Sequence, residues 1–218
     1  YREEKVLSRL AASFHDEVLE NATAVLNRKN SAFESYAIGS NSTTCFLEFV
    51  QAPISLVIAG AGNDAQPLTE IAYLLGWEVT IVDGRPTHAT KERFANAKQV
   101  LIAKPEQVLA QVAIDEQTAF VLMTHNYNYD LALLSILLKT DASYIGSLGP
   151  KKKLIRMLEE LNCHTEENEL RVHGPVGLDI GAETAEEIAI SIIAEIKSVF
   201  SKATAGSLKA KKNSIHEH

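Results

Sequence analysis

Cysteine is scarce in this sequence of 218 residues, where only Cys45 and Cys163 occur. They lie far apart and match no metal-ligand spacing, which excludes a disulfide-stapled scaffold and a zinc-finger-type module. We therefore expect no metal site. Two isolated cysteines suit a reducing compartment, and we expect the protein to be cytoplasmic.

Long apolar runs and an excess of positive charge are also missing. No segment approaches the roughly 20 apolar residues that a membrane-spanning helix needs, and no signal peptide opens the chain. The net charge is −7, which argues against a nucleic-acid partner, because binding to that backbone requires clustered Lys and Arg. The basic stretch at 209–212 is interpreted as part of a solvated tail.

Hydrophobic residues make up 46% of the sequence, enough for a sizeable core. Apolar positions at helical spacing in 1–29, including Val6, Leu7 and Leu10, predict a helix, and two strands are expected at 33–38 and 43–50. We divide the chain into three parts: a small N-terminal α+β segment at 1–52, a larger domain at 53–205 and a polar tail at 206–218.

The larger part alternates continuous apolar segments with amphipathic ones. This pattern is typical of a parallel sheet covered by helices on both faces, so the predicted fold is α/β, doubly wound and Rossmann-like. A capping box of Thr184 and Glu187 predicts the start of the last helix. The other expected strands are 54–60, 78–83, 99–103, 119–124 and 143–148, and the other expected helices are 66–75, 105–112, 130–138 and 151–161.

A glycine turn follows the first of these strands. Gly60, Gly62 and Ala65 fit the G-x-G-x-x-G/A pattern of nucleotide-binding turns, and Asp83 ends the next strand, where an acidic residue can accept from a ribose hydroxyl. Arg85 could equally meet a 2′-phosphate, which leaves NAD and NADP both open. The alternative is a tight strand-to-helix turn without a ligand.

Asp64 places a carboxylate on this turn. It is favourable near a helix N-terminus, by about 0.3–1 kcal/mol, and reduces the need for a phosphate there. The turn therefore resembles a nucleotide-binding turn, but its carboxylate makes it less suited to binding a pyrophosphate. We keep Asp64 among the expected cofactor-binding residues.

Thr124, His125 and Asp130 follow the strand at 119–124. Ligands of open α/β sheets bind beyond the carboxyl ends of the strands, so these residues are expected at the ligand edge, with His125 and Asp130 as the catalytic candidates. Alternatively, His125 bonds only to the loop backbone and Asp130 is the N-cap of the next helix.

Lysines 151–153 open the helix that follows Pro150, where three cations oppose the helix dipole. A bound anion would remove this conflict, so Lys152 is a candidate cofactor-binding residue; the alternative is a set of ordinary exposed lysines. The segment 173–184 is rich in glycine, which suggests close approach to a ligand or to a neighbouring loop. Its Asp179 either contacts a ligand or satisfies loop amides.

Several segments together resemble the XdhC/CoxI family of accessory factors for xanthine dehydrogenase and related molybdenum hydroxylases. They are "GAGNDAQPL", "IVDGRP", "VLMTHNYNYD", "YIGSLGPKKK" and "GPVGLDIGAETAEEIAISIIAEI", and the resemblance covers about residues 54–200. It implies a Rossmann-fold domain behind a smaller N-terminal domain. The N-terminal domain of this family contains a glycine-rich segment with a cysteine, which is not found here. Since the chain also begins with Tyr1 and not Met, we expect the segment 1–52 to be truncated.

The resemblance further implies a molybdenum cofactor of the molybdopterin type, protected during sulfuration and delivered to an apo-hydroxylase. The implied partners are a hydroxylase of the xanthine dehydrogenase type, a cysteine desulfurase and further copies of the chain. NAD(P) remains an alternative ligand, with an oxidoreductase or a nucleotide-sensing module as the alternative functions. The implied site residues are Gly60, Gly62, Asp83, Thr124, His125, Asp130, Gly146, Gly149, Gly177 and Asp179.

Overall fold

The computed structural model describes residues 12–38, 40–163 and 165–210. The predicted helical positions Val6, Leu7 and Leu10 and the end of the tail lie outside these ranges. The chain divides into two compact units, Tyr1–Ala52 and Pro53–His218, and each is described by itself. No described helix is long and apolar enough to cross a membrane.

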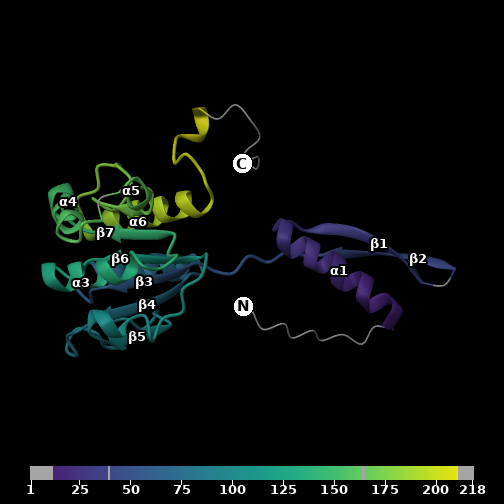
Figure 1. Cartoon of the computed structure of the whole chain (residues 1–218), viewed down its shortest axis with the longest axis horizontal. Coiled ribbons are helices and arrows are strands. Elements are labelled where there is room, and N and C mark those ends of the chain that lie inside the picture. Colours follow the sequence, from purple (N-terminus) through teal and green to yellow (C-terminus); the bar gives the residue numbers. More distant parts are fainter. Residues whose placement is uncertain (1–11, 39, 164, 211–218) are drawn as a thin grey trace. The chain divides into compact units, whose positions relative to one another are not determined.

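The described residues of the first unit form a helix and a hairpin (Figure 1). Helix α1 (Ala12–Arg28) precedes the antiparallel strands β1 (Ala32–Ile38) and β2 (Asn41–Leu47). Tyr36 on β1 is 1% exposed, and its hydroxyl accepts a hydrogen bond from Asn21 on α1 at 3.2 Å. This contact fixes the helix on one face of the hairpin.

The second unit is built on a six-stranded sheet in which every neighbouring pair is parallel. The strand order is β5-β4-β3-β6-β7-β8, which is the 3-2-1-4-5-6 order of doubly wound nucleotide-binding folds. The predicted fold class is confirmed. The strands are β3 (Ser55–Ala59), β4 (Glu78–Asp83), β5 (Gln99–Ile102), β6 (Thr118–Leu122), β7 (Tyr144–Ser147) and β8 (Val172–His173).

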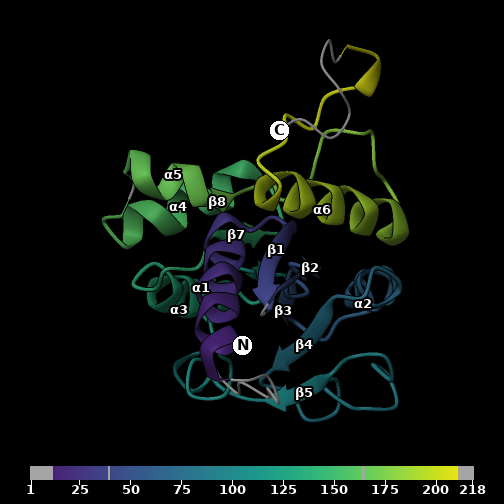
Figure 2. The ribbon, with the colours of Figure 1, turned by 90° about the vertical axis from the view of Figure 1, so that its right-hand side faces the viewer.

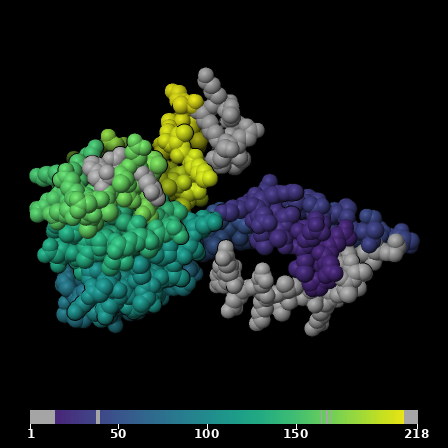
Figure 3. Space-filling view, in the orientation of Figure 1, coloured from purple at the N-terminus to yellow at the C-terminus, as the bar shows by residue number. Residues whose placement is uncertain are grey.

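Two helical layers cover this sheet because its central strands are apolar on both faces. Leu56 and Ile58 belong to one core and Val57 and Ala59 to the other, as the period of two along a strand requires. Helices α2 and α6 pack over the first core, whereas α3 and α4 cover the second (Figure 2). The space-filling view shows this unit as one continuous body (Figure 3). The helices are α2 (Ala65–Leu74), α3 (Tyr127–Leu137), α4 (Lys151–Glu160), α5 (Glu166–Arg171) and α6 (Ala185–Phe200).

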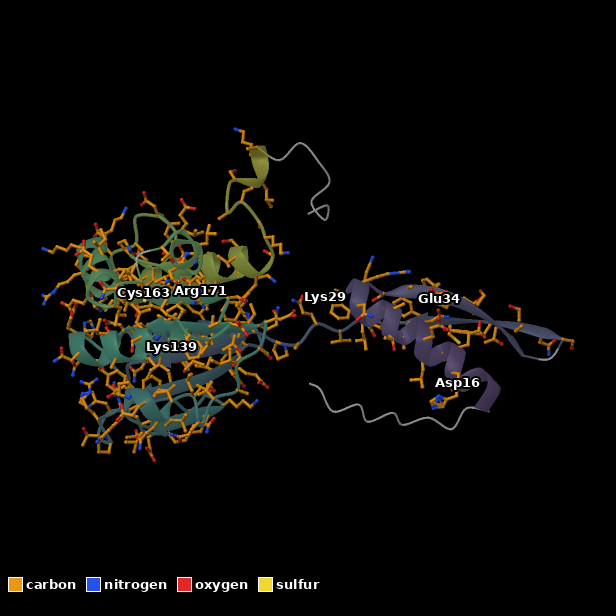
Figure 4. All side chains as sticks on the ribbon, in the orientation of Figure 1. Asp16, Lys29, Glu34, Lys139, Cys163 and Arg171 are labelled. Carbon is orange, nitrogen blue, oxygen red and sulfur yellow. The ribbon has the colours of Figure 1, made fainter. Side chains whose placement is uncertain are left out.

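Four elements differ from the sequence prediction. The helix expected at 105–112 is only a 3₁₀ turn at Pro105–Gln107, and a second such turn covers Leu208–Ala210. Helix α5 and strand β8 were not predicted, because "EENELR" has no apolar period and two residues are too few to show an alternation. Arg171 at the end of α5 donates to the carbonyl oxygens of Thr140, at 2.6 Å, and Leu138, at 2.5 Å. These two residues flank Lys139 in the sequence, and Figure 4 labels both Arg171 and Lys139.

Candidate functional site

The strand order reverses between β3 and β6, and ligands of open parallel sheets bind at such a switch point. The chain leaves β3 toward β4 and β5 on one side and returns to form β6 on the other. The loops that follow β3 and β6 are hydrogen-bonded to each other where they begin, since the Met123 amide donates to Ala59 O at 2.8 Å. The glycine turn and the His125 loop therefore flank the same crevice.

The two glycines of the turn have different structural roles. A Cβ on Gly60 would lie 2.5 Å from Met123 O, and its φ is +123°, so packing and backbone conformation both require glycine there. A Cβ on Gly62 would meet no atom within 4 Å. The described structure thus leaves open space directly beside the Gly62 backbone.

This open space belongs to a crevice with a volume of about 410 Å³, within the range of about 300–1,000 Å³ of small-molecule sites. Of the residues predicted for the site, Gly62, Thr124 and His125 line it. Sequence reasoning named Arg85 as a possible contact for a 2′-phosphate but did not select Asn63, Thr87, His88 or Arg93, although the last three cluster in the segment after β4. The lining residues are Gly62, Asn63, Arg85, Thr87, His88, Arg93, Thr124 and His125.

Asp83 lies beneath the crevice and is 3% exposed. Its Oδ1 accepts from the Arg85 backbone N and Nε, both at 2.9 Å, and its Oδ2 accepts from the Arg85 terminal nitrogen at 2.7 Å and from the Ala61 amide at 2.8 Å. Burial alone would raise the pKa of Asp83, but these hydrogen bonds and the Arg85 charge outweigh it and lower the pKa. Asp83 is therefore ionised, and its carboxylate links Arg85 to the glycine turn by hydrogen bonds.

Arg93 joins the glycine turn to the segment after β4 by hydrogen bonds. One terminal nitrogen donates to Ala61 O at 2.6 Å and His88 O at 2.8 Å, and the other donates to Asn63 Oδ1 at 2.9 Å. All three acceptors are uncharged. Among the described residues no carboxylate pairs with Arg93, so its positive charge is not neutralised locally.

His125 stands at the rim of the crevice with 67% of its side chain exposed. Its φ is +56°, a left-handed conformation that is uncommon for residues other than glycine. The ring Nε2 lies 3.5 Å from Asp64 Oδ2. Asp64 occupies the N-cap position of α2 without a side-chain cap hydrogen bond, so its carboxylate faces His125 across the crevice mouth.

Asp130 is completely buried and does not line the crevice. Its Oδ1 accepts from the Thr124 hydroxyl at 2.5 Å, and its Oδ2 accepts from Lys153 Nζ at 2.7 Å. The alternative that Asp130 is an N-cap is wrong, because α3 begins at Tyr127 and Asn126 caps it by accepting from the Tyr129 amide. Asp130 can act on a ligand only through Thr124 and Lys153.

The three lysines at the start of α4 are not equivalent. Lys151 and Lys152 are exposed, whereas Lys153 turns inward to Asp130 and also donates to Leu148 O at 3.1 Å. The unfavourable placement of these charges on the helix dipole is therefore compensated, for Lys153, by a buried carboxylate of the chain. Lys152, the predicted cofactor residue, is not part of the crevice lining.

The remaining predicted glycines make close contacts within the chain. A Cβ on Gly146 would lie 2.5 Å from Val176, and one on Gly177 would lie 2.1 Å from Ser191 Oγ. Gly149 has a φ of +122° and adjoins the Lys153 stem. Asp179 is exposed. Of the two explanations for the glycine-rich segment, close approach to another part of the chain accounts for Gly177.

A polar cluster of Tyr144, His173 and Glu195 was not predicted. Glu195 Oε2 accepts from the Tyr144 hydroxyl at 2.5 Å and from the Gly177 amide at 3.0 Å, and His173 stacks on Tyr144 with ring centroids 4.4 Å apart. Burial opposes ionisation of Glu195, but its contacts with His173, Tyr144 and Gly177 lower its pKa. The cluster fastens the loop after β8 to α6.

No group of three or more His, Cys, Asp or Glu side chains within the described ranges could hold a metal ion. The crevice instead combines an open backbone with cationic and imidazole side chains. This chemistry fits an anionic organic ligand.

Comparison with known proteins identifies the family. The model of the XdhC Rossmann domain matches residues 56–196, more than half of the chain. The chain belongs to the XdhC family. The matched range contains the whole crevice and all the predicted site residues.

Three relatives are similar to the larger part of the chain. The chain is 35% identical over 155 residues to a probable xanthine dehydrogenase subunit of Bacillus subtilis, covering 71% of this chain and 46% of that protein. It is 33% identical over 154 residues to the uncharacterized protein YqeB of Escherichia coli, covering 69% and 28%. It is 27% identical over 149 residues to the "Molybdenum cofactor insertion chaperone PaoD" of Escherichia coli, covering 67% and 40%. The chain thus spans less than half the length of these relatives.

A structural neighbour agrees as well. It is a crystal structure described as a xanthine dehydrogenase from Bacillus halodurans. It superposes with a TM-score of 0.65 at 26% identity and covers 88% of this chain and 66% of that one.

Proposed function

We propose that this XdhC-family chain is an accessory protein that binds molybdenum cofactor in the switch-point crevice and assists its insertion into a hydroxylase of the xanthine dehydrogenase type. The observation that supports this most strongly is the crevice itself, which joins the open Gly62 backbone to the unneutralised Arg93. The names of two relatives support the choice of molybdenum cofactor as the ligand and of a xanthine dehydrogenase-type hydroxylase as the partner.

The chemistry of the crevice fits this cargo. A molybdopterin-type cofactor carries a fused heterocycle, a dithiolene and one phosphate. Arg93 and Arg85 offer cationic N–H donors, and the volume of about 410 Å³ accommodates a small organic ligand. The cofactor needs only one phosphate contact, so Asp64 on the turn is compatible with it.

His125 is proposed as the group that handles the cofactor at the rim. Its exposed imidazole can donate a hydrogen bond to a ligand oxygen or accept one from a ligand hydroxyl. Asp64 faces the same imidazole, and Thr124 holds the adjoining loop through Asp130. Asp130 is accordingly proposed as a positioning residue behind His125.

The proposal also covers sulfuration of the bound cofactor and the oligomeric state of the chain. While bound, the cofactor is sheltered as its terminal sulfur is installed, with a cysteine desulfurase as the proposed second partner. The chain is proposed to act in the cytoplasm as a homo-oligomer. We propose no role for nucleic acid or for a membrane.

A reconstituted activation assay tests the function. An apo-hydroxylase is incubated with cofactor-loaded chain, and the appearance of hydroxylase activity is followed over time. His125→Ala should slow activation at least tenfold, which corresponds to about 1.4 kcal/mol, while circular dichroism stays unchanged. His15→Ala serves as the matched control, because His15 lies on α1 in the first unit.

The same proteins separate the proposal from its rival, an NAD(P)-dependent oxidoreductase, which the glycine turn also favours. Substrate-dependent oxidation of NADH or NADPH by the purified chain, abolished by His125→Ala, would replace the chaperone function with the oxidoreductase. Activation unaffected by His125→Ala would remove His125 from cofactor handling.

A further inference from the structure

The Asp83–Arg85 pair determines which part of a ligand the crevice can recognise. In dinucleotide-binding folds the acidic residue at the end of the second strand accepts hydrogen bonds from a ribose hydroxyl. Asp83 has this position, at the end of β4. Its two oxygens, however, already receive four N–H groups from Arg85 and Ala61.

A carboxylate has about four lone-pair sites, so Asp83 is saturated by the chain itself. Only 5% of its side chain is exposed, whereas 48% of the Arg85 side chain is exposed above it. A ligand that enters the crevice therefore meets the Arg85 guanidinium and not the Asp83 carboxylate. Recognition of a ribose diol would require breaking a two-point ion pair.

Charge in the crevice favours a compact anion. Arg85 is balanced by Asp83, while Arg93 bonds only to uncharged oxygens of Ala61, His88 and Asn63. The lining also carries the imidazoles of His88 and His125, and the Asp64 carboxylate faces His125 at 3.5 Å. Arg93, on the wall beside the glycine turn, is thus the arginine of the crevice whose bonded partners are all uncharged.

Gly62 provides the space at the same place. Its φ lies outside the left-handed region and a Cβ there would touch nothing, so neither conformation nor packing within the chain requires glycine. Glycine at this position would have a function if a ligand group must approach the Gly62 backbone closely, because a Cβ would block that approach. Arg93 reaches this turn through Ala61 O and Asn63 Oδ1.

We infer that Arg93 and Gly62 form a phosphate-monoester subsite, and that the Asp83–Arg85 pair excludes recognition of a nucleotide ribose. The ligand class is a fused heterocycle that carries one terminal phosphate. This inference rests on the proposed function, since it assigns the groups that recognise the same cargo.

Riboflavin and FMN test the inference, because they share one fused heterocycle and differ by a single phosphate monoester. Calorimetric titration of the full chain should give at least tenfold tighter binding of FMN than of riboflavin, and inorganic phosphate should compete with FMN. NAD⁺ should bind more weakly than FMN. Arg93→Gln should abolish the preference for FMN, whereas Lys152→Gln, which removes an exposed charge outside the crevice, should preserve it.

Arg93→Lys separates charge from the geometry of the turn, because it keeps the cation and loses the fork of hydrogen bonds. It should retain part of the preference for FMN. Equal affinities for FMN and riboflavin, equal loss in the Lys and Gln variants, or no FMN binding below about 1 mM (about −4 kcal/mol) would overturn the subsite. NAD⁺ binding that is tighter than FMN binding and is lost in Asp83→Asn would overturn the exclusion of ribose.

The two proposals fail in different assays. If FMN is preferred through Arg93 but the cofactor-loaded chain activates no hydroxylase, the subsite stands and the accessory function is wrong. If activation proceeds while the phosphate preference is absent, the accessory function stands and the subsite is wrong.

Discussion

Lys153 Nζ lies 2.7 Å from Asp130 Oδ2, and this ion pair joins α4 to α3 directly behind the crevice. Asp130 is completely buried, while 20% of the Lys153 side chain is exposed. The pair also fixes Thr124, whose hydroxyl donates to the other Asp130 oxygen. A buried carboxylate therefore supports the loop that presents His125.

Removing the Lys153 charge should destabilise the fold strongly. Lys153→Met would leave the Asp130 carboxylate buried without its cation, and breaking such a pair costs about 3–5 kcal/mol. Urea unfolding should show this decrease in the free energy of unfolding. Lys152→Met, one residue earlier and exposed, should stay within about 0.5 kcal/mol of the parent chain; similar losses in both variants would mean that the pair does not stabilise the fold.

The two glycines of the turn should respond oppositely to substitution. Gly60→Ala would force a Cβ toward Met123 O at a positive φ and should cost about 1–3 kcal/mol from the backbone strain alone. Gly62→Ala should leave stability unchanged or raise it by up to about 1 kcal/mol, and Gly62→Val should stay folded. Both Gly62 variants should bind FMN more weakly, by at least tenfold for Val, about 1.4 kcal/mol. A folded Gly62→Val chain with unchanged affinity would exclude this turn as the phosphate site.

Glu195 should make stability depend on acid pH. Its folded pKa is lowered below the ordinary value of 4.5, so its stabilisation is complete above that value and is lost as the pH falls through the folded pKa. Glu195→Gln should be less stable than the parent by about 2 kcal/mol at pH 7, and the difference should shrink in acid. Unfolding curves at several pH values measure it; a difference that stays constant into acid would show that the charge of Glu195 is not involved.

Tyr129 should contribute an alkaline transition. Burial, together with the charges of Asp83 and Asp130, raises its pKa to about 12, and its hydroxyl donates to Ala103 O at 2.7 Å. Its contribution is complete below the ordinary pKa of 10.0 and should be lost as the pH rises from there to about 12. Tyr129→Phe should cost about 1 kcal/mol at pH 7 and should reduce the loss of stability above pH 10; an identical alkaline profile would contradict this assignment.

The parallel sheet was predictable because its strands are apolar on both faces and alternate with helical segments. Local period and turn chemistry determine these elements, and the capping box of Thr184 and Glu187 is present as predicted. Strand β8 was beyond prediction, since its pairing with β7 depends on contacts distant in sequence.

The crevice was predictable in position but not in composition. Gly62 and His125 follow from the rule that ligands bind at the carboxyl edge. Arg93 lies far along the chain from the glycine turn and reaches it only through the folded loop after β4, so no local motif reveals it. Asp83 was predicted from its position, but only the side-chain geometry shows that Arg85 occupies its acceptors.

Mass spectrometry of the ligand that remains with the gently purified chain tests the central claim most directly. We predict a molybdenum cofactor of the molybdopterin type on the parent chain and on Lys152→Gln, and its loss from Arg93→Gln and Gly62→Val. Retention of NAD or NADP in its place, or equal retention of the molybdenum cofactor by all four proteins, would contradict the proposed function of the crevice.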